Sequence, residues 1–542
     1  MARTAALAAS LFGLASASSP PWPPTRPRIE YTEGSALGVD VSLPRFGWAL
    51  DYPDLAVTTR GETQAAYQIV VTAQGAATAS WDSGKVESNR TQQVALSPSV
   101  SLQPDTSFDW RVRWWPSSAP DTPSPWLHST FSTGVGSGTD VGEGWKGAQW
   151  IVPSNVRGHG KGNQLRKRFT LPPGGKVHCA TLYVAALGYY QAEVNGRRVS
   201  TKLIGDFTNF EKRVWYDTHN VTAQLQSAGT AASAHAIGIT VAPGWDSRHG
   251  TGKTGIEVLA RLSVSLEGGT HVDVVSDESW LGGNGPLVKA DIYGGEAYNA
   301  SRTTPGWSTG SFVPPATDPE GAGSSSWVNV SLGLPPHNMS NPKHRWPSTI
   351  IASHVDLPQI EVTGSAAALD FWPVQGVPNS WVFDFGVNRA GVTTLSIPGP
   401  VAQKLGSGAV WVQQAAEALM CAKPCGINHF PAQGADEKTT FISDVRFNSV
   451  LGGNDTATID FTPQFAQYGF RYMQLNYSGT VAWAPDNATL RMRFINTAAT
   501  PSASFSTSNA LINEIQAATV TSAASNFMSI RASAAVSPTR TP

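Results

Sequence analysis

FDWRVRWW, residues 108–115, alternates apolar with charged side chains. A period of two is typical of a β-strand with one face in a core, and it puts Trp110 and Trp114 on the same face. Three more β-rich stretches, separated by turn residues, precede it: PRFGWAL (44–50), AYQIVV (66–71) and WDSGKVES (81–88). Short strands at this spacing favour a seven-stranded β-sandwich. We therefore predict a sandwich with both tryptophans in its core.

The same pattern of short strands and turns continues along most of the chain. We predict three β-units, at residues 27–137, 145–340 and 350–497, with LPPHNMSNPKHRWP as the linker between the second and the third. No pronounced helical pattern interrupts them. The predicted fold class is mostly β, with tandem β-sandwich domains.

A helical pattern follows at residues 508–530. Apolar side chains recur on one broad face at a period near 3.6, and Ser508 is placed to cap the N-terminus. These side chains belong to Leu511, Ile512, Ile515, Ala518, Ala523 and Ile530. One amphipathic helix has nothing to pack on by itself, so residues 503–530 are predicted to hold the first helix of an α-helical domain. We expect this helix to be the only one and residues 531–542 to form a disordered tail.

The N-terminus predicts secretion. Arg3, an apolar stretch over residues 5–14 and the small triplet at 15–17 have the order of a signal peptide, here residues 1–17. The apolar stretch is too short to span a membrane. Eight Asn-x-Ser/Thr sequons predict glycosylated surface loops: Asn89, Asn220, Asn299, Asn329, Asn338, Asn454, Asn476 and Asn487. We expect an extracellular glycoprotein.

Composition excludes some partners. The net charge is −1, only 14% of the residues are charged, and no basic cluster is present. Nucleic acid and anionic membranes are therefore not expected partners, and the expected ligand is neutral. The sequence does not predict the oligomeric state.

Three cysteines are few for a secreted chain of this length. Cys421 and Cys425 are spaced to close a small disulfide loop, which leaves Cys179 unpaired. Because Cys179 stands in an apolar strand, we expect it to be a buried small hydrophobic residue. No second Cys or His pair stands at zinc-ligand spacing, so a metal site built from these cysteines is not expected.

The order of motifs along the chain resembles one enzyme family. The four stretches of the first unit lead into WKGAQWI, and ALGYYQAEVNGRRV, GEAYNASRTTPGW, VFDFGVNRAGV and YGFRYMQL follow. Together they are similar to bacterial and fungal α-L-rhamnosidases of glycoside hydrolase family 78, over almost all of residues 44–530. The resemblance implies a fibronectin III-like sandwich, a rhamnosidase N-terminal β-domain and a concanavalin-like domain. It implies release of terminal α-L-rhamnose from plant glycosides or pectic side chains.

The resemblance also implies where the catalytic groups lie. In this family SNFMSI opens a six-hairpin α/α barrel that carries both catalytic carboxyl groups, whereas here SNFMSI (525–530) is followed by an unrelated tail. Inverting hydrolysis needs an acid and a base roughly 6.5–9.5 Å apart. Asp384 and Glu417 stand in strand motifs, where a structural role is the favoured interpretation. We assign no catalytic residue and expect these 542 residues to be inactive.

Sugar binding in the second unit is a further implication, because some family members bind rhamnose there through a calcium ion. The corresponding loops are GDFTNFEKR (205–213) and APGWDSRHG (242–250). Asp206 and Asn209 would be calcium ligands, while Asn209, Trp245 and Asp246 would contact the sugar. The alternative is that the polar groups only satisfy turn backbones and the tryptophan packs between domains. No cofactor is required, and calcium is an optional one.

Two functions remain open at this point. In the first, the chain represents an α-L-rhamnosidase that ends before its barrel through a frame or splice error or natural truncation. In the second, it is a secreted, non-catalytic carbohydrate-binding or structural β-module. Both share a partner, a rhamnose-containing glycan or glycoside.

Overall fold

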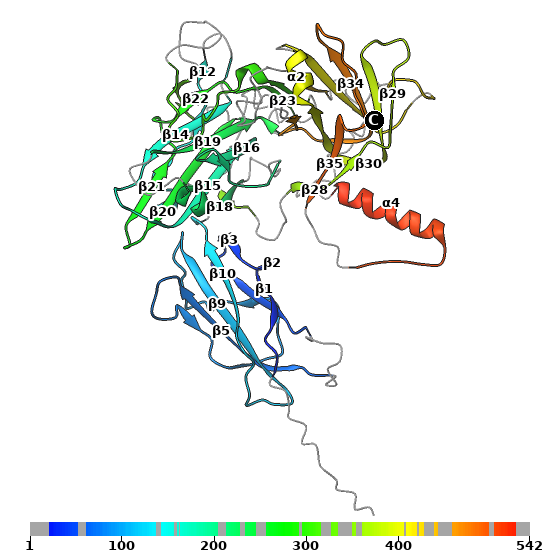
Figure 1. Cartoon of the computed structure of the whole chain (residues 1–542). Coiled ribbons are helices and arrows are strands. Elements are labelled where there is room, and N and C mark those ends of the chain that lie inside the picture. The colour runs from blue at the N-terminus through cyan, green and yellow to red at the C-terminus, as the bar shows by residue number, and fades with distance from the viewer. Residues whose placement is uncertain are drawn as a thin grey trace, which may run out of the picture. The chain divides into compact units, whose positions relative to one another are not determined.

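The chain divides into two compact units, residues 1–133 and 134–542. Figure 1 shows the computed structural model, which contains mostly strands and few helices. It describes residues 21–51, 61–136, 143–156, 160–161, 163–203, 213–227, 234–244, 256–291, 295–315, 327–333, 349–353, 360–405, 408–419, 422–427, 438–442, 458–497 and 503–526. None of the described helices is long and apolar enough to cross a membrane.

The first unit is a two-sheet sandwich. One sheet has the order β2-β1-β4-β8, and the other has the order β3-β10-β9-β5-β6, with β7 also paired to β5. Its strands are β1 (Thr25–Ile29), β2 (Thr32–Glu33), β3 (Ala36–Val39), β4 (Arg45–Ala49), β5 (Gln64–Ala73), β6 (Trp81–Asp82), β7 (Val86–Glu87), β8 (Val94–Ala95), β9 (Ser107–Pro116) and β10 (Leu127–Thr133). Trp110 and Trp114 are both buried, as predicted. Trp110 packs on Phe46 between the sheets, and Trp114 packs edge-on against Trp22.

The second unit opens with another sandwich. A seven-stranded sheet has the order β26-β11-β20-β15-β18-β27, with β21 on β20, and a six-stranded sheet has the order β17-β16-β19-β14-β22-β25. The elements are η1 (Glu143–Trp145), β11 (Ile151–Val152), β12 (Asn155–Val156), β13 (Gly160–Lys161), β14 (Gln164–Thr170), β15 (Val177–Leu187), β16 (Tyr189–Val194), β17 (Arg197–Arg198), β18 (Val214–Asn220), α1 (Thr222–Gln226), β19 (Ala234–Ala242), β20 (Glu257–Leu266), β21 (His271–Val275), β22 (Leu281–Gly283), η3 (Ala300–Arg302), β25 (Trp327–Asn329), β26 (Ser331–Leu332) and β27 (Ile350–Ala352). Apolar side chains from both sheets fill the space between them.

The remaining strands form one ten-stranded sheet of order β23-β24-β32-β31-β34-β30-β35-β28, with β29 and β33 also paired to β30. Its elements, with two helices, are β23 (Leu287–Asp291), β24 (Gly295–Asn299), β28 (Ile360–Ala367), β29 (Asp370–Pro373), β30 (Ser380–Ile397), α2 (Gly399–Leu405), β31 (Val410–Ala416), β32 (Lys438–Ile442), β33 (Ile459–Phe461), β34 (Tyr468–Ser478), β35 (Leu490–Thr497) and α4 (Ala510–Asn526). The long strand β30 pairs with β34 along most of its length, and its second half also pairs with β35. All of these strands are hydrogen-bonded into one sheet.

The boundary predicted between residues 340 and 350 is not a boundary between sheets. Strand β24 precedes it but pairs in parallel with β32 of the ten-stranded sheet. Strand β27 follows it but pairs in parallel with β18 of the second sandwich. The two parts exchange strands and form one compact unit. Alternation along a strand reveals which face is buried but not which strand is its neighbour, so the sequence pattern did not show this exchange.

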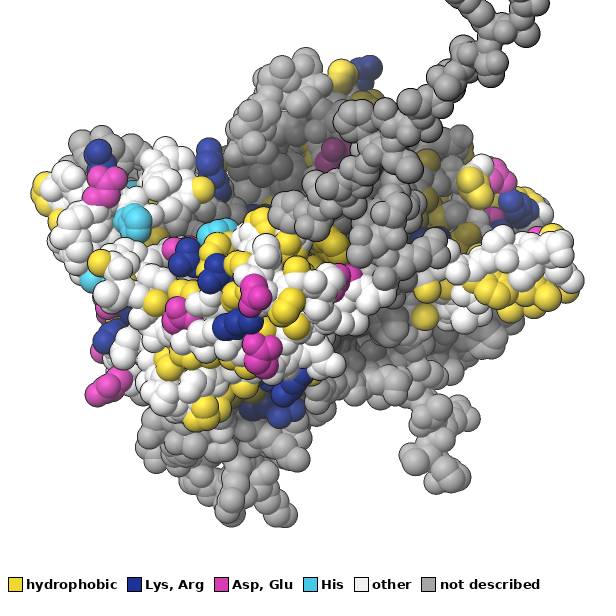
Figure 2. Space-filling view, turned by 90° about the horizontal axis from the view of Figure 1, so that it is seen from below, with side chains coloured by type: hydrophobic (Ala, Val, Ile, Leu, Met, Phe, Trp, Pro, Cys, Tyr) yellow, Lys and Arg dark blue, Asp and Glu magenta, His cyan; other side chains and the backbone are white. Residues whose placement is uncertain are grey.

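Helix α4 lies within the predicted helical segment, but the predicted cap is wrong. The side-chain oxygen of Asn509, not Ser508, accepts hydrogen bonds from the backbone N–H groups of Leu511 (3.0 Å) and Ile512 (3.3 Å). No residue of α4 is buried. Figure 2 shows its hydrophobic side chains gathered on one side of the helix at the right of the view. Because α1 and α2 are also helical, α4 is not the single helix that was predicted.

Candidate functional site

The residues predicted to bind sugar and calcium lie outside the described part of the chain. These are Asp206, Asn209, Trp245 and Asp246. The predicted tail at 531–542, the signal peptide and Ile530 also lie outside it. The candidate site is therefore built from the strands that flank the two predicted loops.

These strands meet at one end of the second sandwich. At this end Leu187 pairs with Glu257, the first residue of β20, and Tyr189 pairs with Ala242, the last residue of β19. Strand β18 begins here too, because its Tyr216 pairs with Ala185 near the end of β15. The described residues that border the two predicted loops, in β18, β19 and β20, therefore lie near this end.

A buried polar cluster stands directly beside these strand ends. Tyr190 Oη donates to Asp217 Oδ2 at 2.6 Å and lies 2.8 Å from His219 Nε2. Lys202 Nζ donates to both oxygens of Asp217, at 3.0 and 3.1 Å. Tyr190 belongs to the six-stranded sheet, whereas Asp217 and His219 belong to the seven-stranded sheet. The cluster therefore ties the two sheets together at the end where the predicted loops attach.

The environment of this cluster determines which of its side chains are charged. Burial opposes ionisation of Asp217, but Lys202, His219 and the Tyr190 hydroxyl outweigh burial and lower the pKa of Asp217. Burial lowers the pKa of His219 to about 4, although the charge of Asp217 opposes this shift. At neutral pH the cluster holds a carboxylate, an ammonium and a neutral imidazole. Sequence reasoning missed the cluster, although Asp217 and His219 stand two apart in the strand WYDTHN, a spacing that puts both on one face.

The carboxylates of the predicted strand motifs have structural partners. Arg471 donates two hydrogen bonds to Asp384, at 2.8 and 2.9 Å, and Gly386 N donates to the same carboxylate at 2.7 Å. Hydrogen bonding from Arg471 lowers the pKa of Asp384. Glu417 accepts from Asn388 at 3.1 Å. These contacts support the structural interpretation of Asp384, which is buried, whereas Glu417 is exposed.

Glu296 is a buried carboxyl group that sequence reasoning did not single out. It stands in the GEAYN stretch, is 1% exposed, and accepts hydrogen bonds from the backbone N–H groups of Gln464 and Phe465, both at 2.8 Å. Its second oxygen is buried and has no hydrogen-bond partner among the described residues. Burial raises the pKa of Glu296 to about 7. Such a pKa suits a general acid, but the side chain is enclosed and bound to a turn, so its geometry favours a structural role.

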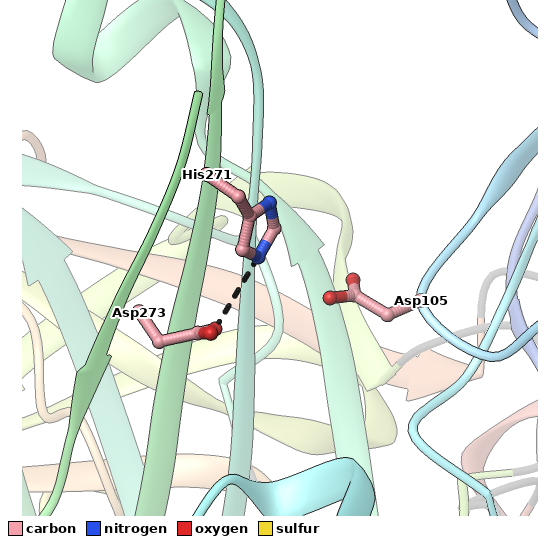
Figure 3. A group of neighbouring side chains, drawn as sticks. All are labelled: Asp105, His271 and Asp273. Carbon is pink, nitrogen blue, oxygen red and sulfur yellow. Dashed lines mark ion pairs between the residues drawn. The ribbon is translucent and has the colours of Figure 1, made fainter. Parts of the chain in front are cut away.

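Two serines and an aspartate surround His271 on β20 and β21. His271 Nε2 lies 3.5 Å from Asp273 Oδ1 (Figure 3). The same nitrogen lies 3.2 Å from Ser263 Oγ, and Nδ1 lies 3.3 Å from Ser265 Oγ. Asp273 is also held by the buried Arg261 at 2.7 Å. Asp105, drawn in the same figure, belongs to the first unit and is not part of this arrangement.

The predicted cysteine and glycan sites are described only in part. Cys425 is disulfide-bonded, but Cys421 lies outside the described residues, so their pairing stays a prediction. Cys179 is free and only partly buried, not fully buried as expected.

Four sequon asparagines are exposed: Asn89, Asn220, Asn329 and Asn487. Asn299 is half-buried, and Asn338 and Asn454 lie outside the described residues. Asn476 does not stand in a surface loop, because it lies within β34 and its side chain bonds to Ser380 and Gln414.

Comparisons with known proteins agree with this architecture. Residues 24–137 match the family model described as the Rha78A-like N-terminal immunoglobulin domain, and residues 175–322 match the alpha-L-rhamnosidase N-terminal domain. An alpha-L-rhamnosidase of Streptomyces avermitilis is 26% identical over 450 residues, which are 79% of this chain and 36% of that protein. One from Formosa agariphila is 27% identical over 81% of this chain and 43% of that protein. The chain thus spans less than half the length of these relatives.

Solved structures share the fold. The alpha-L-rhamnosidase from Dictyoglumus thermophilum aligns with a TM-score of 0.74 at 24% identity, over 93% of this chain and 52% of that one. The Streptomyces avermitilis enzyme, solved with L-rhamnose, aligns with a TM-score of 0.73 at 21% identity, over 93% of this chain and 60% of that one.

Two parts of the chain thus match N-terminal domains of α-L-rhamnosidases. The chain is similar in sequence to α-L-rhamnosidases and shares the fold of the solved α-L-rhamnosidase structures. The resemblance seen in the sequence is thereby confirmed.

Proposed function

We propose that the chain is the β-domain region of an α-L-rhamnosidase that hydrolyses terminal non-reducing α-L-rhamnose residues of plant glycosides or pectic side chains. The observation that carries this proposal is the succession of the two matched domains in the order found in α-L-rhamnosidases, on a fold shared over 93% of the chain. The relatives named for this activity are longer proteins, and this chain covers only part of their length.

We propose further that the described β-domains do not themselves supply the catalytic pair. Asp384 is bound by Arg471, Asp217 by Lys202, and Glu296 by two backbone N–H groups. An inverting pair needs one free acid and one free base about 6.5–9.5 Å apart across an accessible sugar. These three carboxyl groups are engaged and enclosed, which supports a role in holding the β-domains together.

Sequencing the transcript beyond the codon for Ile530 tests the assignment. A frame that restores Pro-Thr-Asp-Cys-Pro, the stretch that the family resemblance implies after SNFMSI, and a product that hydrolyses p-nitrophenyl α-L-rhamnoside, would support the α-L-rhamnosidase. A verified stop after Pro542 would favour the alternative, a secreted non-catalytic carbohydrate-binding or structural β-module.

Rhamnose binding in the second sandwich is part of the proposal. Asp206 and Asn209 would hold an optional calcium ion, and Asn209, Trp245 and Asp246 would contact the sugar. Its support is that the strand after the first loop and the strands on both sides of the second loop have ends near one another in the sandwich. Calorimetric titration of L-rhamnose with and without calcium tests it. Binding that Asp246→Ala abolishes is expected, and unchanged binding in this variant would contradict the proposed contact.

Secretion also remains a proposal. Its support is the N-terminal pattern of residues 1–17 and four exposed sequon asparagines. An extracellular glycoprotein with access to plant glycosides suits the proposed activity.

A further inference from the structure

Cationic and aromatic side chains alternate along one outer face of the first sandwich. Arg111 and Arg113 each place their Cζ atom 4.5 Å from the ring centroid of Trp126. Arg113 lies 5.0 Å from the ring of Trp115, and Lys85 Nζ lies 5.3 Å from the same ring. We call these five residues the cation–aromatic ladder. Residues 111, 113 and 115 share a face of β9 because side chains alternate along a strand.

The members of the ladder differ in how their polar groups are used. Arg113 donates to Gln68 Oε1 at 3.0 and 2.7 Å. Lys85 donates to the Pro120 carbonyl at 2.9 Å and pairs with Glu87 at 3.2 Å. Arg111 is exposed and, within the described part of the chain, makes no hydrogen bond or ion pair. Its guanidinium is held against an indole while its N–H groups face solvent.

The charge of the ladder is incompletely balanced. Three cations face one directly paired carboxylate, Glu87. Asp109 stands two residues before Arg111 on β9, but Gln74 is its hydrogen-bond partner, at 3.3 Å. On β10, directly opposite Arg111, stands the exposed His128, which is not an acidic residue. An anionic group is therefore electrostatically favoured at Arg111.

We propose that the cation–aromatic ladder binds the carboxylates of an acidic polysaccharide, with Arg111 as the main contact. A guanidinium binds a carboxylate through two parallel N–H···O bonds, and stacking on Trp126 orients it in advance. The succession of Arg111, Arg113 and Lys85 suits an extended chain with repeated carboxylates. Identification of the ligand as a polysaccharide rests on the proposed function. The rhamnose site proposed above is on the second sandwich and takes a neutral sugar.

The test compares binding of the whole chain to polygalacturonate and to its full methyl ester, two polymers that differ in the carboxylate charge. Retention by polygalacturonate, weakened by salt, with little retention by the ester is expected. Arg111→Gln should weaken binding about tenfold, as expected for the loss of a charge-assisted bidentate contact. Arg111→Lys should recover only part of it. Arg26→Gln, at an exposed arginine paired with Glu33 in the same unit, is the matched control.

Several results would overturn the proposal. They are no retention of the wild-type chain, equal retention by the ester, and equal affinity of Arg111→Gln and wild type. Full recovery by Arg111→Lys, or equal retention by single-stranded DNA, would show a general cationic surface instead. Melting temperatures of all variants check that Arg111, an exposed residue, does not affect folding. Titration with L-rhamnose is independent of this surface, so failure of the ladder and failure of the proposed function are distinguishable.

Discussion

At the scale of single residues, the carboxylate of Asp384 has a structural role, although a carboxylate in a sequence motif could also be catalytic. It accepts from Arg471 and from Gly386 N, where the backbone takes a φ of +80°. We expect Asp384→Asn to lower the free energy of unfolding by about 1–3 kcal/mol, because the amide has no negative charge and keeps only one of the two oxygens that accept from Arg471. Urea unfolding measures the change. Glu267→Gln, at an exposed pair with Lys176, should cost roughly 0–1 kcal/mol, and an equal effect of the two variants would contradict the account.

Glu296 gives the stability a pH dependence. Its pKa is raised to about 7 in the folded chain, against 4.5 for the free side chain. A raised carboxyl pKa means that the folded state binds the proton more tightly than the unfolded state does. The contribution of Glu296 to the free energy of unfolding is therefore fully present below about pH 4.5 and is lost as pH rises through 7. The loss is about 1.4 kcal/mol per pH unit over this window. Glu296→Gln should remove it and make the chain more stable than wild type at pH 8.

Thermal unfolding at pH 5 and pH 8 measures this effect. Glu278→Gln, which changes an exposed carboxylate in the same unit, is the control and should follow wild type. If the melting temperatures of wild type and Glu296→Gln changed in parallel between the two pH values, the raised pKa of Glu296 would be contradicted. Direct observation of its carboxyl group by isotope-edited infrared spectroscopy should show a midpoint near 7.

The four exposed sequons give a further prediction at this scale. Chain secreted from a eukaryotic host should carry N-linked glycans at Asn89, Asn220, Asn329 and Asn487. Asn476 should remain unmodified in the folded protein, because its side chain is bonded within the ten-stranded sheet. Mass spectrometry of peptides after enzymatic deglycosylation measures each site. Full occupancy at Asn476 alone would contradict the fold of β34.

At the scale of elements, helix α4 depends on its cap. Asn509→Ala should remove the acceptor for Leu511 N and Ile512 N and cost about 1 kcal/mol of local stability. Faster hydrogen exchange in the first turn, with the last turns unchanged, is the expected result. Ser508→Ala is the matched control. An effect of the serine variant instead would restore the cap predicted from the sequence.

Strand formation could be predicted from the sequence, whereas strand pairing could not. The period of two correctly predicted strand β9 and the burial of Trp110 and Trp114, because the alternation of side chains follows from backbone geometry. The exchange of β24 and β27 depends on contacts between residues far apart in the chain, which leave no local pattern. The Tyr190–Asp217–Lys202 contacts were missed for the same reason: their members come from separate segments.

At the scale of the whole molecule, the exposed apolar side of α4 predicts how the chain behaves in solution. Leu511, Ile512 and Ile515 are 63%, 44% and 56% exposed. Apolar surface is worth roughly 25 cal/mol per Å² when buried, so such a stripe favours association. We expect the 542-residue chain to self-associate and a chain ending at Thr497 to be more soluble. Equal monodispersity of both by light scattering would favour an autonomous module.

The most direct test of the account is a hydrolysis assay on the purified 542-residue chain with p-nitrophenyl α-L-rhamnoside. The account predicts no turnover above a buffer blank, because its β-domain carboxyl groups hold the fold together and supply no catalytic pair. Turnover that persists through repurification and disappears in Glu296→Gln or Asp384→Asn, with folding retained, would contradict it and place an active site within the β-domains.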